Sequence, residues 1–194
     1  MSKIFSPLLS LGFASLFISF TFAQEKKTTD PPKPAQSISQ ELSWGWDDIG
    51  KKLIAMAEDF PEAQYGFKAQ KDERSFGENL LHVAFDYNIV ISAMKGSEER
   101  IAWNEDSLYK KYPTKEAVVK YLKQSVVDGA ELIKMQGDST LTREFKFPWG
   151  NFMSHGLLGW MGIIEHAGEH YGQLVVYYRV NGMVPPASRP KNKS

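Results

Sequence analysis

The sequence predicts an all-α protein, a four-helix bundle, and three observations support this fold class. Four segments carry apolar residues at the helical spacing of three and four. Capping residues and helix-stopping residues mark the ends of these segments. No segment alternates apolar and polar residues strongly enough to predict a strand. Four amphipathic helices joined by loops are typical of a bundle.

The first helix is predicted over Leu42–Phe60 and the second over Ser75–Met94. One face of the first helix carries an apolar stripe, made of Leu42, Trp46, Ile49, Leu53, Met56 and Phe60. Pro61 ends this helix because proline lacks a backbone N–H. At the start of the second helix, Ser75 and Glu78 match the capping-box pattern, and Gly96 is the expected C-cap.

The third helix is predicted over Thr114–Met135, between Pro113 and Gly137. Its apolar stripe consists of Val118, Leu122, Val126, Ala130 and Ile133. The loops between the predicted helices are long, so the residues alone leave the order of the helices around the bundle open.

The fourth helix is predicted over Phe152–Val180 and ends at Asn181-Gly182. Its interior contains five glycines, Gly156, Gly159, Gly162, Gly168 and Gly172. Each costs about 1 kcal/mol relative to alanine in a helix interior. Either the helix begins later than Phe152, or these glycines let a neighbouring segment or a ligand approach closely.

Residues 1–23 have the pattern of a signal peptide. Lys3 supplies a positive charge, the run from Pro7 to Phe22 is apolar, and Thr21-Phe22-Ala23 matches a cleavage site. The alternative is an uncleaved anchor, but the run is short for a bilayer span of about 20 residues. We therefore expect an exported protein, periplasmic or secreted, without stable membrane anchoring after cleavage.

The rest of the chain divides into three parts. Residues 24–40 are rich in lysine, threonine and proline and are predicted to be a disordered linker. Residues 41–186 form the predicted bundle, and residues 187–194 a disordered tail. This organisation gives one globular domain.

Charge and cysteine content exclude several classes of function. The chain contains 23 Lys plus Arg and 23 Asp plus Glu, so its formal net charge is zero. A balanced chain gives no reason to expect nucleic acid as a partner. The absence of cysteine excludes disulfides, thiolate ligands and a cysteine nucleophile. A bound metal must therefore use His, Asp or Glu.

The placement of the histidines is the most informative feature of the sequence. His166 and His170 lie one helical turn apart, in a stripe with Ile163, Leu174 and Tyr177, and therefore face inward. His82, in an apolar part of the second helix, is also expected to point inward. Three converging imidazoles predict a site for a divalent metal ion, since buried imidazoles need partners. Three protein ligands would leave one position open for water or substrate.

Other interpretations of these residues are weaker. His155 lies three turns before His166 and is interpreted as a structural or surface residue. His166–His170 also matches the H-x-x-E-H pattern of inverted zincins, with Glu169 as general base. Such peptidases are much larger, and only 24 residues (194 minus 170) follow His170. Glu169 is then a solvated residue or a hydrogen-bond partner of an imidazole.

Three polar residues near the histidines are candidates for contacting the metal-ligating imidazoles without binding the ion themselves. Glu78 precedes His82 by one turn, Asp86 follows it by one turn, and Gln173 follows the histidine pair. The structural interpretation is favoured for each: a helix cap for Glu78, a solvated helix face for Asp86 and an amide at the core edge for Gln173.

Three motifs, in this order, resemble the DinB-like family of damage-inducible four-helix bundles. They are Tyr65-Gly66-Phe67-Lys68 followed by Ser75–His82, then His166–Gln173, then Arg179–Pro186. The resemblance implies an up-down-down-up topology, metal-ligand roles for His82, His166 and His170, zinc or nickel as the metal, and a possible homodimer. It also implies kinship with thiol-dependent transferases and isomerases, although their thiols are cytosolic and this chain is predicted to be exported.

These observations lead to one functional hypothesis and two alternatives. The first is a metal-dependent hydrolase or transferase acting on a small molecule, whose bound ion would lower the pKa of a water molecule towards about 7. The second is a non-catalytic metal-binding or dimeric interaction module. The third is a purely structural bundle with three satisfied core histidines.

Overall fold

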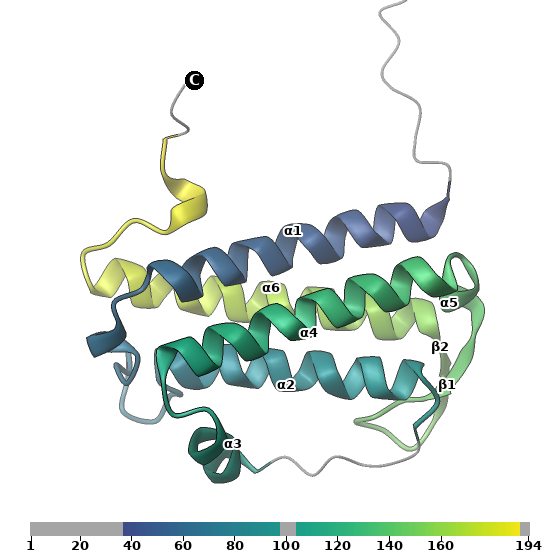
Figure 1. Ribbon diagram of the computed structural model, residues 1–194, viewed down its shortest axis with the longest axis horizontal. Coiled ribbons are helices and arrows are strands. Elements are labelled where there is room, and N and C mark those ends of the chain that lie inside the picture. The colour runs from purple at the N-terminus through teal and green to yellow at the C-terminus, as the bar shows by residue number, and fades with distance from the viewer. Residues whose placement is uncertain (1–36, 98–103, 191–194) are drawn as a thin grey trace, which may run out of the picture. The chain divides into compact units, whose positions relative to one another are not determined.

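The computed structural model describes residues 37–97 and 104–190. The predicted signal peptide, residues 1–23, and most of the predicted linker lie outside the described residues. Four long helices make up the fold (Figure 1): α1 Ile38–Asp59, α2 Phe76–Met94, α4 Lys115–Gln136 and α6 Gly156–Val180. The predicted all-α bundle is confirmed. In the described part of the chain, no helix is long and apolar enough to span a bilayer.

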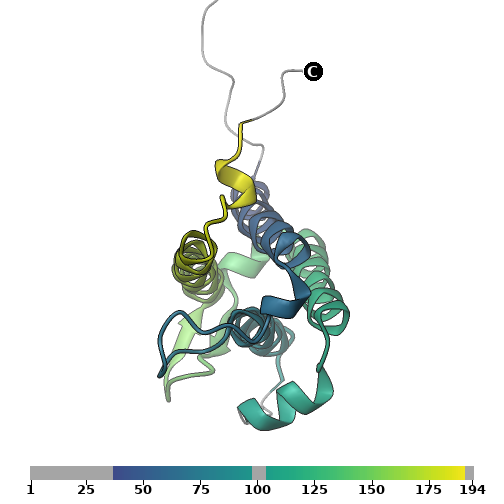
Figure 2. The same ribbon diagram turned by 90° about the vertical axis from the view of Figure 1, so that its left-hand side faces the viewer.

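The order of the helices follows from their packing and direction. α1 and α2 each pack against both α4 and α6, so α1 lies diagonally opposite α2. Figure 2, which looks along the bundle, shows the same arrangement. In Figure 1, α1 and α6 run in one direction and α2 and α4 in the other. This is the expected up-down-down-up topology, and it places α2 beside α6, the two helices that carry the histidines of interest.

Several short elements connect the long helices and were not predicted from the sequence. They are η1 Glu62–Gln64, α3 Glu105–Lys111, α5 Ser139–Thr142, β1 Glu144–Lys146, β2 Met153–His155 and η2 Pro186–Ser188. The two strands form an antiparallel hairpin in which Phe145 pairs with Ser154. Phe145 is buried under α6, so the hairpin covers one end of the core.

The helix ends follow the local chemistry of their caps. The capping box of α2 is formed, with Glu78 N donating to Ser75 Oγ at 3.3 Å and Ser75 N donating to the Glu78 carboxylate. α1 begins at Ile38, four residues before the predicted Leu42, because Ser37 caps it. Its first turn therefore lies in the segment predicted as linker.

The start of α6 differs from the sequence prediction, and its glycines are of two kinds. The residues after Phe152 enter β2, and the helix begins only at Gly156. A Cβ on Gly156 would lie 1.8 Å from the carbonyl oxygen of Thr140, and one on Gly159 would lie 2.3 Å from Met94 Cε. At the other three, Gly162, Gly168 and Gly172, a Cβ would meet nothing within 4 Å. Two of the glycines thus permit a neighbouring segment to pack closely against α6, whereas the other three have no close neighbour.

Aromatic side chains fix the helices against one another. Trp46 of α1 lies 4.4 Å, ring to ring, from Tyr87 of α2, and its Nε1 donates to the Val126 carbonyl of α4 at 2.8 Å. Tyr178 of α6 donates to the Met56 carbonyl of α1 at 2.9 Å. Because these polar atoms are paired inside the core, the register between the helices is well defined.

The last described residues contact α1. Arg189, which lies in the segment 187–194 predicted as a disordered tail, donates to both carboxylate oxygens of Asp59. The Nη1–Oδ1 distance is 2.8 Å and the Nη2–Oδ2 distance is 2.5 Å. This bidentate pair joins the chain that follows η2 to the C-terminal turn of α1.

Candidate metal centre

α2 and α6 bring five polar side chains together between them. Asn79, His82 and Asp86 follow one another at steps of three and four along α2 and therefore share one face. His166 and His170 share a face of α6 in the same way. Since α2 packs against α6, the two faces meet inside the bundle.

The three imidazoles predicted to converge lie close together. Ring centroids are separated by 5.4 Å between His82 and His166, 4.7 Å between His82 and His170, and 4.5 Å between His166 and His170. One nitrogen from each ring lies within 4.8 Å of the others, the separation expected for ligands of one ion. The group can therefore hold a metal ion.

The three imidazoles differ in their exposure to solvent. His170 is buried, the side chain of His82 is 15% exposed, and that of His166 is 32% exposed. His166 is therefore the most exposed of the three imidazoles.

Asn79 determines the orientation of His170. Asn79 Oδ1, which can only accept, lies 3.0 Å from His170 Nδ1, so Nδ1 carries the proton and Nε2 keeps its lone pair. The Asn79 amide group donates to the Tyr177 hydroxyl at 3.3 Å, and that hydroxyl donates to the Arg74 carbonyl oxygen. This chain of hydrogen bonds, buried at His170 and Asn79, holds the ring of His170 with Nε2 towards the centre.

Asp86 contacts two of the three histidines. Its Oδ2 lies 3.0 Å from His166 Nε2 and 3.2 Å from His82 Nε2. Asp86 is only 5% exposed, so the interpretation of this residue as part of a solvated face is wrong. The helical spacing indicated an inward-facing position for Asp86, because a residue four positions after an inward-facing histidine lies on the same helix face.

The three imidazoles differ in their tendency to bind a proton. Burial lowers the pKa of His82 to about 4 and that of His170 to about 4. The hydrogen bond with Asp86 raises the pKa of His166 above its ordinary value. At neutral pH, His82 and His170 are thus in the neutral form that binds metals, and His166 is the ring at which a proton competes with an ion.

The other polar residues considered from the sequence lie outside this group. His155 is exposed at the end of β2. Glu78 forms the cap of α2, with Lys68 Nζ 3.7 Å from its carboxylate, as its structural interpretation predicted. Glu169 is exposed and lies 3.5 Å from His166 Nδ1, whereas Gln173 is exposed rather than at the core edge.

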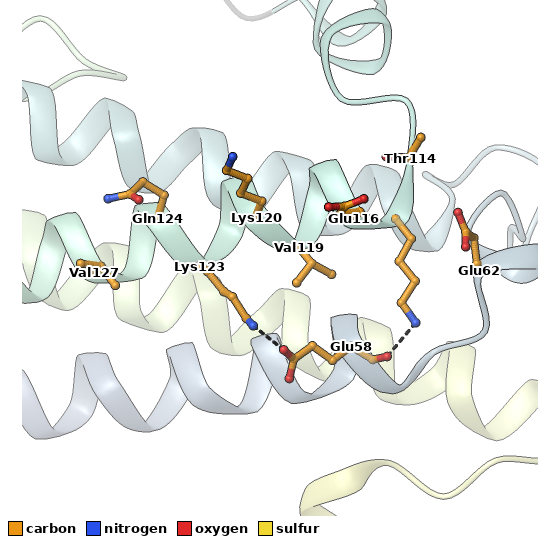
Figure 3. Close-up of a pocket in the computed structure, with 10 residues that line it drawn as sticks. Glu58, Glu62, Thr114, Glu116, Val119, Lys120, Lys123, Gln124 and Val127 are labelled. Atoms are coloured by element: carbon orange, nitrogen blue, oxygen red, sulfur yellow. Dashed lines mark hydrogen bonds and ion pairs between the residues drawn. The ribbon is translucent and has the colours of Figure 1, made fainter.

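A second hollow lies between α1 and α4 and is shown in Figure 3. This groove of about 700 Å³ is lined by side chains of both charge signs. Lys123 pairs with the Glu58 carboxylate, and Lys115 Nζ donates to the carbonyl oxygens of Glu58 and Phe60 at 2.6 and 2.8 Å. No histidine lines the groove, and Lys115 and Lys123 join its two helices, so it is separate from the candidate metal centre.

Fold and site together define a class of protein, an all-α four-helix bundle with three converging imidazoles on its second and last long helices. The family model of the DinB superfamily matches residues 46–174, a span that includes all three histidines, and the chain belongs to this superfamily. No curated protein matches the sequence.

Solved structures with the same fold are distant in sequence. One is a DinB-like protein from Bacillus cereus ATCC 10987, 15% identical, with a TM-score of 0.62 over 76% of this chain and 95% of that chain. Another is a conserved protein from Enterococcus faecalis, 17% identical, with a TM-score of 0.59 over 76% of this chain and 99% of that chain. These likenesses establish the fold.

Proposed function

We propose that this protein holds one divalent metal ion through His82, His166 and His170 and acts as a metal-dependent hydrolase or transferase on a small molecule. The observation that carries the proposal is the convergence of three imidazole nitrogens within 4.8 Å, on neighbouring helices and inside the bundle. Core positions of this kind are ordinarily apolar, and a cation gives three grouped imidazoles a common partner.

The residues present fit such an ion. Imidazole nitrogens suit zinc and nickel, the two metals that we propose. Burial keeps His82 and His170 neutral, which is the form required of a ligand. The buried carboxylate of Asp86 supplies a negative charge beside the group and would offset part of the charge of a divalent cation.

The roles of the surrounding residues follow from their contacts. A divalent ion in this place would lower the pKa of a bound water and polarise a substrate oxygen. Asn79 orients His170, and the exposed Glu169 carboxylate is placed to accept from His166 Nδ1. His166, the most exposed ring of the three, borders the route by which substrate enters.

Three further properties belong to the same proposal. The signal-like residues 1–23 support export to the periplasm or the medium. Export would separate the protein from cytosolic thiols and so favours hydrolysis over thiol transfer. Homodimer formation is the third property, and sedimentation of the purified mature chain tests it.

The burial of the centre favours one competing function. Two of the three imidazole side chains are at most 15% exposed, which suits a module that retains a metal without catalysis. A measurement of exchangeable water at the bound ion of a cobalt-substituted protein distinguishes metal retention from catalysis. A bound ion that carries no exchangeable water would favour retention, whereas water in exchange with solvent would favour the enzyme.

Elemental analysis of protein purified without a nickel column tests metal binding itself. We expect about one equivalent of metal per chain, lost in His82→Ala and kept in the control His155→Ala, whose side chain is exposed on β2. If the wild-type chain contains no metal and takes none up from solution, the proposed function is wrong.

A further inference from the structure

Asp86 occupies a position that three-histidine coordination does not explain. Its Oδ2 lies within 3.2 Å of the Nε2 atoms of both His82 and His166. In the described part of the chain, these two imidazoles are the hydrogen-bond and ion-pair partners of the carboxylate. The side chain is nearly inaccessible to solvent, so water does not replace them.

The contacts of the other ring nitrogens identify which atoms face the centre. His170 Nδ1 is engaged by Asn79, and His166 Nδ1 lies 3.5 Å from Glu169 on the exposed side. The Nε2 atoms of these two rings are therefore the ones available to an ion. Asp86 Oδ2 contacts one of them, His166 Nε2, directly.

The distances match those between two ligands of one ion. Metal–ligand bonds of about 2.1 Å place adjacent ligand atoms roughly 3.0 Å apart at right angles and roughly 3.4 Å apart at tetrahedral angles. The Asp86 Oδ2 atom lies 3.0 Å from one Nε2 and 3.2 Å from the other. It thus stands beside the two nitrogens as a neighbouring ligand would.

Metal binding would also take away the hydrogen bond that Asp86 now accepts from His166. An Nε2 atom that binds an ion has no proton left to donate, so the carboxylate would lose its hydrogen bond from His166. A buried carboxylate that loses a hydrogen bond is disfavoured unless another group takes its place. The bound ion would be the nearest group with which the Asp86 carboxylate could pair.

We propose that Asp86 is a fourth protein ligand, through Oδ2, which makes the centre a three-histidine, one-aspartate site. This inference rests on the proposed function. A tetrahedral ion would then be fully held by the protein, and a position for water or substrate would open only on an ion that takes five or six ligands. Nickel takes more than four ligands readily, and zinc does so by expanding its coordination.

Cobalt(II) titration of Asp86→Asn, followed by visible absorption, tests the proposal. We expect binding at least about 100-fold weaker than in the wild type, with ligand-field bands of altered position and intensity. Loss of a residue that only supports a ligand can also weaken binding by about 10–100-fold, so the bands are the deciding readout. Asp47→Asn, which removes an exposed carboxylate of α1, is the matched control and should leave both unchanged.

A measurement on the wild-type chain keeps the test decisive if Asp86→Asn does not fold. In the cobalt-loaded protein, the β-protons of a ligating aspartate are strongly shifted by the unpaired electrons, and deuteration of aspartate should remove these resonances. The assignment of Asp86 as a fourth ligand would be overturned if the ligand-field bands did not change in Asp86→Asn. It would also be overturned if no aspartate resonance were found among the shifted signals. Either result would leave the proposed function intact. A wild-type chain that binds no cobalt would overturn both.

Discussion

The side-chain amide oxygen of Asn79, Oδ1, lies 3.0 Å from His170 Nδ1 and so determines which nitrogen of His170 faces His82 and His166. The two residues come from different helices, α2 and α6, and both are buried. The orientation of one candidate ligand therefore depends on the register between these helices.

Replacing Asn79 by alanine should weaken metal binding without removing the three imidazoles. We expect affinity to fall by about 10–100-fold, because the ring of His170 would lose the acceptor that fixes its tautomer. Competition with a chromophoric chelator measures the change. Gln173→Ala, which removes an exposed amide of the same helix as His170, should bind as the wild type does. Equal affinities for all three proteins would show that Asn79 has no part in orienting the ring.

The pair formed by Asp59 and Arg189 should make stability depend on acid. The hydrogen bond from Arg189 holds the pKa of the Asp59 carboxyl below its ordinary value. A lowered carboxyl pKa stabilises the fold above the unfolded-state value of about 3.9, and this stabilisation is lost as the pH falls through the folded-state pKa.

We therefore expect Arg189→Ala to lower Tm at neutral pH and to approach the wild type in acid, where Asp59 is protonated in both proteins. Thermal unfolding followed by circular dichroism between about pH 7 and about pH 2 measures the difference. Arg179→Ala, an exposed position in the last turn of α6, serves as control. A difference in Tm that stays constant down to the lowest pH would contradict the assignment.

Two glycines of α6 should respond to alanine in opposite directions. At Gly156 a Cβ would lie 1.8 Å from a backbone oxygen, so Gly156→Ala should destabilise the protein by about 1–3 kcal/mol. At Gly162 nothing lies within 4 Å, and alanine should stabilise the helix by about 1 kcal/mol. Urea unfolding measures both changes. Destabilisation by Gly162→Ala would mean that its open face is covered in solution.

Lys115 and Lys120 line the same groove but should differ in their effect on stability. Lys115 donates to two carbonyl oxygens at the C-terminal end of α1, where the helix leaves acceptors without internal partners. Lys115→Met should therefore cost about 1 kcal/mol of unfolding free energy. Lys120→Met, at an exposed position of α4, should change it by less than about 0.5 kcal/mol. Equal losses of unfolding free energy in the two variants would show that the effect comes from removing a positive charge and not from the hydrogen bonds of Lys115.

Helical periodicity was sufficient to predict the bundle and the meeting of the histidines. His166 and His170 replace apolar residues in the stripe of α6 that faces the core, where His170 is buried and His166 lies at the edge. The buried position of Asp86 was accessible from the same rule, since it lies one turn after His82. The sequence interpretation gave more weight to its charge than to its spacing. A buried carboxylate is nevertheless reasonable where the His166 imidazole donates to it.

Other features could not be predicted because they depend on contacts between different elements, which no local sequence pattern reveals. The start of α6 moved from Phe152 to Gly156 because residues Met153–His155 pair with β1 instead of continuing the helix. The close approach at Gly156 involves Thr140, a partner in a different element. The short helix α3 carries too few residues to show a periodic stripe.

The placement of the centre between α2 and α6 also bears on how the chain is held together. His82 and His166 are 84 positions apart (166 minus 82), and the chain contains no cysteine. An ion bound by both would act as a reversible cross-link that closes this long loop, in the manner of a disulfide. Chelation would then loosen the last long helix first, and its amides would exchange hydrogen faster than those of α4.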